Sequence, residues 1–441
     1  MAQLERWYKK EDYWAVILGL VLTAAAVLGY FTGAAPFFKQ LAVSLPTWST
    51  KVGPVLAALQ KSWGIVYLFV IFLVLFTAAS KIIGYSVKRF IPGFSALFVI
   101  SVIVTAVSTN QFAKEWQLET PFLALLVGML VSNTVKLPEW FQSALRTEFY
   151  VKTGIVLMGA TLPLTLIFTA GPIAILQATI VSVVTFFVIY FAASKLFGLD
   201  PRFSSTLAAG GSICGVSAAI AVGGACRAEK NHVSISISMV IIWAVAMIFV
   251  LPLLSKTLGL EPGPAGAWIG TSEFADAAGF AAAEAIGDER AVKAFTLMKI
   301  IGRDMFVGVW ALLVAYLSVT VWERKQRGQA EKIRLDELWH RFPKFIIGFF
   351  AASVLISFAT AYLEPKAAAQ FSKDVIGPIK TLRGWTFTWT FLSIGFTTRF
   401  RDLTGFGWKP LAAFAVGVAV NVPLGYLLSN RIFVDYWLSI K

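Results

Sequence analysis

Residues 203–226 read FSSTLAAGGSICGVSAAIAVGGAC, an uncharged stretch long enough to cross a bilayer as a helix. Its middle is interrupted by Gly210, Gly211 and the run GSICGVS at 211–217. Lipid cannot hydrogen-bond the backbone groups that such a break frees, so a broken helix persists only where protein or a water-filled cavity satisfies them. Broken helices of this kind build the solute sites of many transporters. The alternative is close helix packing, which small residues also permit.

The rest of the chain has the composition of a membrane protein. Of its 441 residues, 58% are hydrophobic and 14% are charged, and the mean hydropathy is +0.75. Because a soluble single-core protein does not reach these values, we predict an all-α polytopic membrane protein. Uncharged runs lie at 13–38, 62–80, 90–113, 120–135, 153–194, 203–226, 231–255, 345–363 and 410–430. With the less clean segments 264–286, 294–321 and 384–404 they give about 13 candidate helices, re-entrant ones included.

The run at 153–194 is about twice the length of one crossing. Ala170, Gly171 and Pro172 lie near its midpoint, and Gly-Pro pairs typically mark turns, so we predict two helices joined there. No interval between spans is long enough for a separate soluble domain. We therefore predict a single membrane domain, with residues 1–118 as N-terminal scaffold spans and residues 119–441 as a transporter region containing a core and the remaining scaffold helices.

Basic residues gather in three connections between the predicted spans. The connection at 323–344 carries seven Lys or Arg residues, and two shorter connections carry Lys81, Lys88 and Arg89, or Lys136, Arg146 and Lys152. Positively charged loops stay in the cytoplasm, and counting crossings from a cytoplasmic N-terminus places all three loops on that side. We predict a multi-pass protein of the inner (plasma) membrane. This topology explains the net charge of +14, and attraction of the basic loops to anionic lipids is a second contribution. The charge therefore gives no reason to predict nucleic-acid binding.

A weak internal echo predicts an inverted repeat. At an offset of 236 residues, the segments GAT at 159–161 and AG at 170–171 match GFT at 395–397 and FG at 406–407. Each set lies between two apolar segments, and an odd number of predicted crossings separates the copies. Copies separated in this way have opposite orientations in the membrane, as in many secondary transporters. Three identities alone also arise by chance.

Three ionisable residues lie inside the predicted span at 294–321, namely Lys299, Arg303 and Asp304. Lys299 and Arg303 are four apart, on one face of a helix, and charges at membrane depth face a cavity or a partner. One hypothesis is that they hold an anionic solute, since a guanidinium binds two oxygens at once. The alternatives are neutralisation by Asp304 and an acid on a neighbouring helix, or snorkelling to the interface.

The segment 264–286 contains acids and no cation. Glu273 and Asp276 are three apart, which places them on one face if the segment is helical. A carboxylate pair at membrane depth suits Na⁺ coordination or proton carriage, so we predict that both residues couple transport to an ion. The alternatives are that they are counter-ions of Lys299 and Arg303, or that the segment is a solvated extracytoplasmic loop.

The run at 210–217 supplies the other half of an anion site. If a helix restarts within it, the first N–H groups and the hydroxyls of Ser212 and Ser217 donate to oxyanion oxygens, and the helix dipole favours negative charge. Sulfate, sulfonate or carboxylate groups fit this chemistry. The predicted substrate site therefore consists of Ser212, Ile213, Cys214, Gly215, Ser217, Lys299 and Arg303.

Nothing in the sequence predicts an enzyme, a metal site or a bound cofactor. His232 and His340 are the only histidines, too few for a histidine metal site. No nucleotide-binding motif is present, so we do not expect ATP to drive the protein. The expected partners are a small anionic solute, the lipid bilayer, and H⁺ or Na⁺ as the coupling ion.

Taken together, these motifs resemble the YeiH family, whose members are proposed sulfate exporters. The resemblance runs from about residue 120 to 430 and is carried by GSICGVS at 211–217, GTS at 270–272, the pair Lys299 and Arg303, IG at 394–395 and WKP at 408–410. That family is similar to the superfamily of sodium-dependent bile-acid symporters and cation/proton antiporters. The resemblance implies a core of crossed, broken helices that moves against a scaffold or dimerisation domain in an elevator-like cycle.

The chain departs from this pattern after the Gly-Thr-Ser motif. Many members of the family carry His followed by Asp or Glu there, whereas this chain has Phe274 and Ala275, with its acids at Glu273 and Asp276. A proton relay through that histidine therefore does not carry over to this chain.

We expect a secondary active transporter of a small inorganic or organic anion that works by alternating access, coupled to H⁺ or Na⁺. A cation/proton antiporter, in which the acids alone bind the transported ion, and a passive anion channel are the alternatives. The additional N-terminal spans at 13–38 and 62–80 favour a homodimer.

Overall fold

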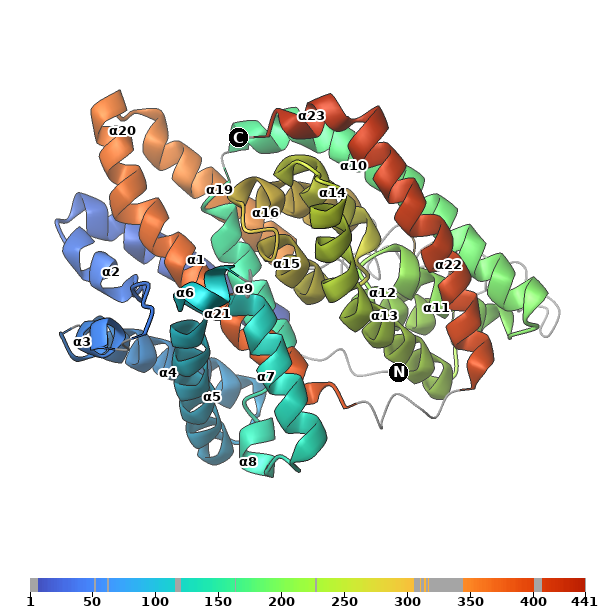
Figure 1. Ribbon diagram of the computed structural model, residues 1–441, viewed down its shortest axis with the longest axis horizontal. Helices are drawn as coiled ribbons and strands as arrows, with labels where there is room; N and C mark the ends of the chain where they lie inside the picture. Colours follow the sequence, from blue (N-terminus) through green and yellow to red (C-terminus); the bar gives the residue numbers. More distant parts are fainter. Residues whose placement is uncertain are drawn as a thin grey trace. The chain divides into compact units, whose positions relative to one another are not determined.

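The computed structural model describes residues 7–50, 53–61, 63–115, 120–162, 164–226, 228–304, 310, 313–314, 316, 344–399 and 407–440. Every regular element among these residues is a helix (Figure 1). Seven of the described helical segments are long and apolar enough to cross a membrane: Glu11–Phe31, Gly64–Ile83, Val87–Ser108, Gly171–Leu196, Asn231–Thr257, Lys344–Ala361 and Trp408–Ile432. The other predicted spans form shorter or less apolar helices, or run outside the described residues.

The chain folds into two compact units, and unit 1 comprises Met1–Ile167 and Lys344–Arg399. Within it α21 packs on α7 and α9, and α1 packs on α9 and α19. Its α-helices are α1 (Glu11–Phe31), α2 (Ala35–Leu41), α3 (Gly53–Lys61), α4 (Gly64–Ile83), α5 (Val87–Ser108), α6 (Gln111–Glu115), α7 (Thr120–Thr134), α8 (Glu139–Gln142), α9 (Thr147–Gly159), α19 (Lys344–Ala361), α20 (Pro365–Phe371) and α21 (Gly377–Thr397), with a short 3₁₀ turn, η1 (Trp7–Lys9), and a π-helical segment, η6 (Ser372–Ile376).

Aromatic side chains fill the centre of unit 1. Trp389 on α21 contacts the rings of Phe76 on α4, Phe94 on α5 and Tyr150 on α9, each close to edge-on. Aromatic pairs prefer such geometry because the positive edge of one ring meets the negative face of the next. The Nε1 of Trp389 donates to Ser101 Oγ at 3.0 Å, so the buried indole N–H has an acceptor. This cluster ties four helices together.

Unit 2 comprises Phe168–Pro343 and Phe400–Lys441. Its α-helices are most of α10 (Leu164–Phe191), then α11 (Pro201–Ser212), α12 (Val216–Ala225), α13 (Lys230–Thr257), α14 (Pro262–Ser272), α15 (Asp276–Glu284), α16 (Glu289–Thr296), α22 (Trp408–Leu427) and α23 (Val434–Leu438), with π-helical segments η2 (Ala192–Leu196), η3 (Leu297–Arg303) and η8 (Leu428–Ile432). The predicted boundary at residue 118 lies within unit 1. The assignment of scaffold and core roles stays a prediction.

Two helices of unit 2 are broken, and the breaks meet. The predicted interruption of 203–226 falls at 213–215, between α11 and α12, and a second break at 273–275 separates α14 from α15. Gly215 has a positive φ of 75°, a conformation that glycine adopts without the steric cost of a Cβ. A Cβ there would lie 2.2 Å from the carbonyl oxygen of Phe274. The backbones of the two breaks are therefore in contact, with no side chain between them.

The predicted turn at 170–172 is wrong. Helix α10 runs through Pro172 without a break, and membrane helices tolerate such a proline because neighbouring groups satisfy the freed carbonyl. The chain instead breaks after Gly159, where α9 ends and a Cβ would lie 2.1 Å from the carbonyl oxygen of Phe349. Leu162 precedes a proline in the sequence, and the residue before proline is disfavoured in a helix. That signal marked the true break.

Antiparallel helix pairs accompany the sequence echo at an offset of 236. In unit 1, Gly154 of α9 lies against Phe387 of α21, and Arg383, nearer the start of α21, donates to Thr161 after the end of α9 at 3.1 Å. In unit 2, α10 and α22 lie side by side (Figure 1). Asn421 of α22 donates to Thr185 of α10 at 2.9 Å, and these residues are 236 apart. Gln177 of α10 donates to Ser429 at 2.7 Å, on the segment η8 that continues α22. Helices at equivalent positions of the two copies therefore pack antiparallel, as an inverted repeat predicts.

The contact between the breaks can be tested by placing a methyl group in it. We expect Gly215→Ala to lower the free energy of unfolding by about 3 kcal/mol or more, because backbone strain adds to overpacking. Gly407→Ala is the matched control, since Gly407 has the same φ of 75° with nothing within 4 Å of a Cβ, and should cost about 1–3 kcal/mol from strain alone. Thermal unfolding in detergent measures both. Equal losses for the two variants would contradict the contact.

Candidate functional site

Lys299 and Arg303 approach the two breaks from a single π-helical segment. Helix α16 continues into η3, which carries both residues, and both side chains are fully buried. Segments of π-helix are rare and are found frequently at functional sites. The predicted four-residue spacing therefore does bring both cations to one place, although on a wider turn than that of an α-helix.

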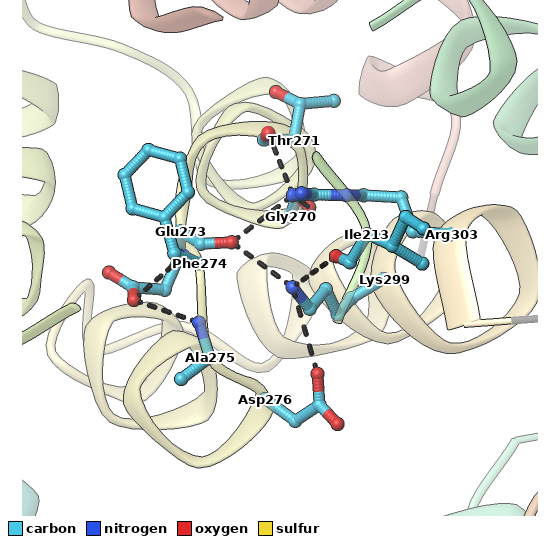
Figure 2. Close-up of polar contacts among 9 residues, drawn as sticks. All are labelled: Ile213, Gly270, Thr271, Glu273, Phe274, Ala275, Asp276, Lys299 and Arg303. Atoms are coloured by element: carbon cyan, nitrogen blue, oxygen red, sulfur yellow. Dashed lines mark hydrogen bonds and ion pairs between the residues drawn. The ribbon is translucent and has the colours of Figure 1, made fainter. Parts of the chain in front are cut away.

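The ammonium group of Lys299 joins the two breaks (Figure 2). Its Nζ donates to the carbonyl oxygens of Ile213 and Glu273, both at 3.1 Å, and lies 3.6 Å from Asp276 Oδ1. Ile213 and Glu273 are the C-terminal caps of α11 and α14. The carbonyl end of a helix carries partial negative charge and favours a cation. Lys299 therefore neutralises the ends of both half-helices at once.

The guanidinium of Arg303 binds the same carbonyl end of α14. Its Nη1 donates to Gly270 O at 3.0 Å, Thr271 O at 2.8 Å and Glu273 O at 3.1 Å (Figure 2). The Nε and Nη2 atoms have no hydrogen-bond partner among the described residues. Backbone carbonyls thus take one nitrogen of the guanidinium, and two nitrogens, Nε and Nη2, remain for another acceptor. Snorkelling to the interface is excluded, because the side chain is 0% exposed.

Glu273 and Asp276 do not share one helical face as predicted, because Glu273 lies in the break itself. Its Oε1 accepts from the N–H groups of Phe274 at 2.9 Å and Ala275 at 3.3 Å, ahead of the first residue of α15. Glu273 is 0% exposed, which excludes the alternative of a solvated loop. The side chain of Asp276 is 12% exposed and approaches Lys299. The counter-ion alternative therefore fits Asp276 better than Glu273.

The start of α12 is buried, and its N-cap residue has no side chain that could cap it. Gly215 occupies the N-cap position without a side-chain hydrogen bond, and Ser212, Ile213 and Cys214 are buried beside it. The Oγ of Ser212 has no partner among the described residues. The side chain of Ser217 lies outside the described part of the chain. All seven predicted substrate residues therefore lie on the elements that meet where the breaks at 213–215 and 273–275 touch, a place that we call the crossing, and the structure describes the side-chain surroundings of all of them except Ser217.

The sequence prediction missed the backbone acceptors of the site. The carbonyls of Ile213, Gly270, Thr271 and Glu273 hold the two cations, and a carbonyl leaves no signature in a sequence. The available signal was a pair of buried cations with two Gly- and Ser-rich interruptions. His232 lies outside this group and stacks on Phe203 with 4.5 Å between ring centroids. His340 and nearly all of the basic loop at 323–344 lie outside the described residues.

Comparison with known proteins gives the family. The family model described as conserved hypothetical protein 698 matches residues 92–414. A UPF0324 membrane protein of Rhodopirellula baltica is 35% identical over 388 residues, which cover 86% of this chain and 70% of that protein. The chain belongs to the UPF0324 family of membrane proteins. The resemblance to the YeiH family is thereby confirmed, because the matching family model covers the YeiH and UPF0324 proteins as one family.

Other UPF0324 relatives cover different shares of the chain. A UPF0324 membrane protein of Nitrosomonas europaea is 29% identical over 483 residues and covers 96% of both chains. One of Nitratidesulfovibrio vulgaris is 31% identical over 372 residues, which are 83% of this chain and 63% of that protein. No solved structure matches the chain. These names describe membrane proteins, in agreement with the seven candidate spans.

Removing the ammonium group from this UPF0324 protein should destabilise the fold without any solute present. Lys299→Met leaves the carbonyl of Ile213 without its donor, removes one of the two donors to the carbonyl of Glu273 and takes the cation away from Asp276. We therefore expect a loss of about 3 kcal/mol or more. Lys293→Met, on the same helical stretch but partly exposed, should change stability by about 0.5 kcal/mol or less. Thermal unfolding in detergent compares them. A wild-type unfolding temperature for Lys299→Met would show that the carbonyl ends have other partners.

Proposed function

We propose that this protein is a secondary active transporter of a small anion of the sulfate, sulfonate or carboxylate class, coupled to H⁺ or Na⁺. The observation that carries the proposal is the arrangement of the four half-helix ends at the crossing. Lys299 satisfies the two carbonyl ends, those of α11 and α14, and Arg303 also binds that of α14. The N–H ends of α12 and α15 carry partial positive charge and remain for an anion.

The two N–H ends differ, and the difference selects one of them. Just ahead of α15, the N–H groups of Phe274 and Ala275 already hold the Glu273 carboxylate, whereas the N-cap of α12 is Gly215, which has no side chain to cap the helix. Helix N-termini bind sulfate, phosphate and carboxylate groups through their backbone N–H groups. Arg303, whose Nε and Nη2 lack a hydrogen-bond partner among the described residues, offers a fork that fits two oxygens of such an anion. We propose the start of α12 as the anion site, with Arg303 as its cation.

A cation/proton antiporter is the second candidate, and the acids favour it. Glu273 and Asp304 are fully buried and Asp276 is largely buried, so carboxylates outnumber the cations Lys299 and Arg303 around the crossing. Buried acids in membranes carry protons and bind cations. Under this reading the two cations only hold the helix ends, and flux would depend on a cation and need no anion.

We further propose an arrangement in the plasma membrane with a cytoplasmic N-terminus and a cytoplasmic 323–344 loop, because basic loops remain inside. Unit 2 contains both breaks and would be the core of an elevator-like transporter. A homodimer is the expected assembly. A reporter enzyme fused within 323–344 that is active only in the periplasm would remain inactive, and an active reporter would contradict this orientation.

Counterflow tests the anion proposal directly. Radiolabelled sulfate is offered to proteoliposomes preloaded with unlabelled sulfate, sulfite, taurine or a simple carboxylate, at two pH values and with or without Na⁺. We expect accumulation driven by at least one preloaded anion, because an alternating-access carrier exchanges solutes across the membrane. Flux that depends on a cation and needs no anion would favour the antiporter instead, and fast flux without counterflow would indicate a channel.

Arg303→Lys distinguishes the binding of the α14 carbonyl end by Arg303 from its proposed binding of the anion. A lysine keeps a charge that reaches the carbonyl end of α14 and loses the fork, so we expect a folded protein whose apparent anion affinity falls about ten- to hundredfold. Arg290→Lys is the matched control, because Arg290 is exposed and pairs with Asp288 at 2.8 Å outside the crossing. Wild-type affinity in Arg303→Lys would remove Arg303 from the anion site.

A further inference from the structure

Glu273 carries a buried carboxylate whose two oxygens have different surroundings. Its Oε1 accepts from the N–H groups of Phe274 and Ala275, at 2.9 and 3.3 Å, whereas its Oε2 is buried and has no hydrogen-bond partner among the described residues. Figure 2 shows the carboxylate turned away from Lys299 and Arg303. One oxygen is therefore fixed by the two N–H groups just ahead of α15, and the other is available for a proton.

The nearby cations bind the backbone of Glu273 and not its side chain. Lys299 and Arg303 both donate to the carbonyl oxygen of Glu273, each at 3.1 Å. Lys299 lies 3.6 Å from Asp276, the acid with which it forms an ion pair. A fully buried carboxylate without a direct ion pair is costly in its charged form. Among the acids predicted to couple transport, Glu273 is therefore the one suited to exchange a proton.

The carboxylate also lies close to the proposed anion site. The residue whose N–H binds Oε1, Phe274, has its carbonyl oxygen against Gly215, where a Cβ would come within 2.2 Å. Gly215 is the N-cap of α12. An anion at the start of α12 and a charged Glu273 would thus be neighbours, on either side of the contact between Gly215 and Phe274. The buried surroundings screen charge poorly, so the two negative charges would repel each other.

The other charged and titratable groups around Glu273 come from three places. Lys299 and Arg303, on η3, interact electrostatically with its carboxylate. Those two cations in turn interact electrostatically with three further groups, which are Asp304 at the end of η3, Asp276 on α15 and Cys214 in the first break. Neither of the two cations, Lys299 and Arg303, donates a hydrogen bond to Oε2 of Glu273.

We infer that Glu273 takes up a proton when an anion binds at the start of α12, so that anion and proton are carried together. The inference rests on the proposed function and names H⁺ as the coupling ion and Glu273 as its carrier. The proton comes from solvent and converts the carboxylate into a carboxylic acid whose Oε1 keeps both N–H bonds. Protonation removes the repulsion between two buried negative charges. By linkage, each ligand then raises the affinity for the other.

The expected pH dependence has a fixed sign. Because the protonated form of Glu273 is the one that accepts the anion, affinity is highest at low pH. It falls as pH rises through the range in which Glu273 loses its proton, by about tenfold per pH unit once that proton must be taken up on binding. Binding through the α12 N–H groups without this linkage would leave the affinity unchanged.

Calorimetry of sulfate binding to the full chain in detergent tests the inference. Titrations in two buffers of different ionisation heat give the number of protons taken up, which we expect to be about one per sulfate where Glu273 is ionised. Glu273→Gln retains an oxygen that accepts from the N–H groups of Phe274 and Ala275 and is always neutral. It should bind sulfate with no proton uptake and with an affinity independent of pH. Asp288→Asn is the matched control, since Asp288 is a partly exposed helix cap and asparagine caps equally well.

Each outcome has a separate meaning. Sulfate binding by the wild type without proton uptake would overturn the inference and leave the proposed function standing. Proton uptake that persists in Glu273→Gln and disappears in Asp276→Asn would overturn the assignment to Glu273. No sulfate binding or counterflow by folded wild-type protein would overturn the proposed function for this anion, and the inference with it.

Discussion

The interior of unit 2 depends on the bond between one ammonium group and two helix ends. Breaking a helix inside a bilayer exposes carbonyl groups that lipid cannot satisfy, and the described part of unit 2 contains two broken helices. Lys299 binds the carbonyl ends of both, and Arg303 reinforces the second. Two buried cations and two interrupted helices would each be unfavourable alone, but together each satisfies the other. The position of the N–H ends of α12 and α15 follows from this pairing.

The sequence predicted the class of fold and several of the residues that come together at the crossing, because glycines and buried charges are conspicuous in an apolar chain. It predicted the break within 203–226 and the pairing of Lys299 with Arg303 on one segment. It did not predict what those cations bind, since backbone carbonyls look the same in every residue. Glu273 and Asp276 were assigned one helical face because spacing alone cannot show that the helix begins only at Asp276.

The turn placed at 170–172 and the inverted repeat show opposite limits of local patterns. Gly171 and Pro172 are strong turn formers in water, but α10 continues through them. The repeat has only three identities in the sequence, yet α9 pairs with α21, and α10 with α22, in antiparallel fashion. The bond between Thr185 and Asn421 joins residues at the repeat offset. The antiparallel packing of helices at this offset is what an inverted repeat predicts, and it is visible in the structure although the sequence retains only three identities.

The contact between Gly215 and Phe274 has an evolutionary consequence. The two breaks touch through backbone atoms alone, and the cations are held by carbonyls, so the frame of the site depends on few side chains. Substitutions at Ser212, Cys214 or Phe274 can alter the charge and volume of the site while the crossing itself persists. For the transporter that we propose, one inherited frame could in this way serve different solutes, because side chains around the crossing can change without moving the helix ends.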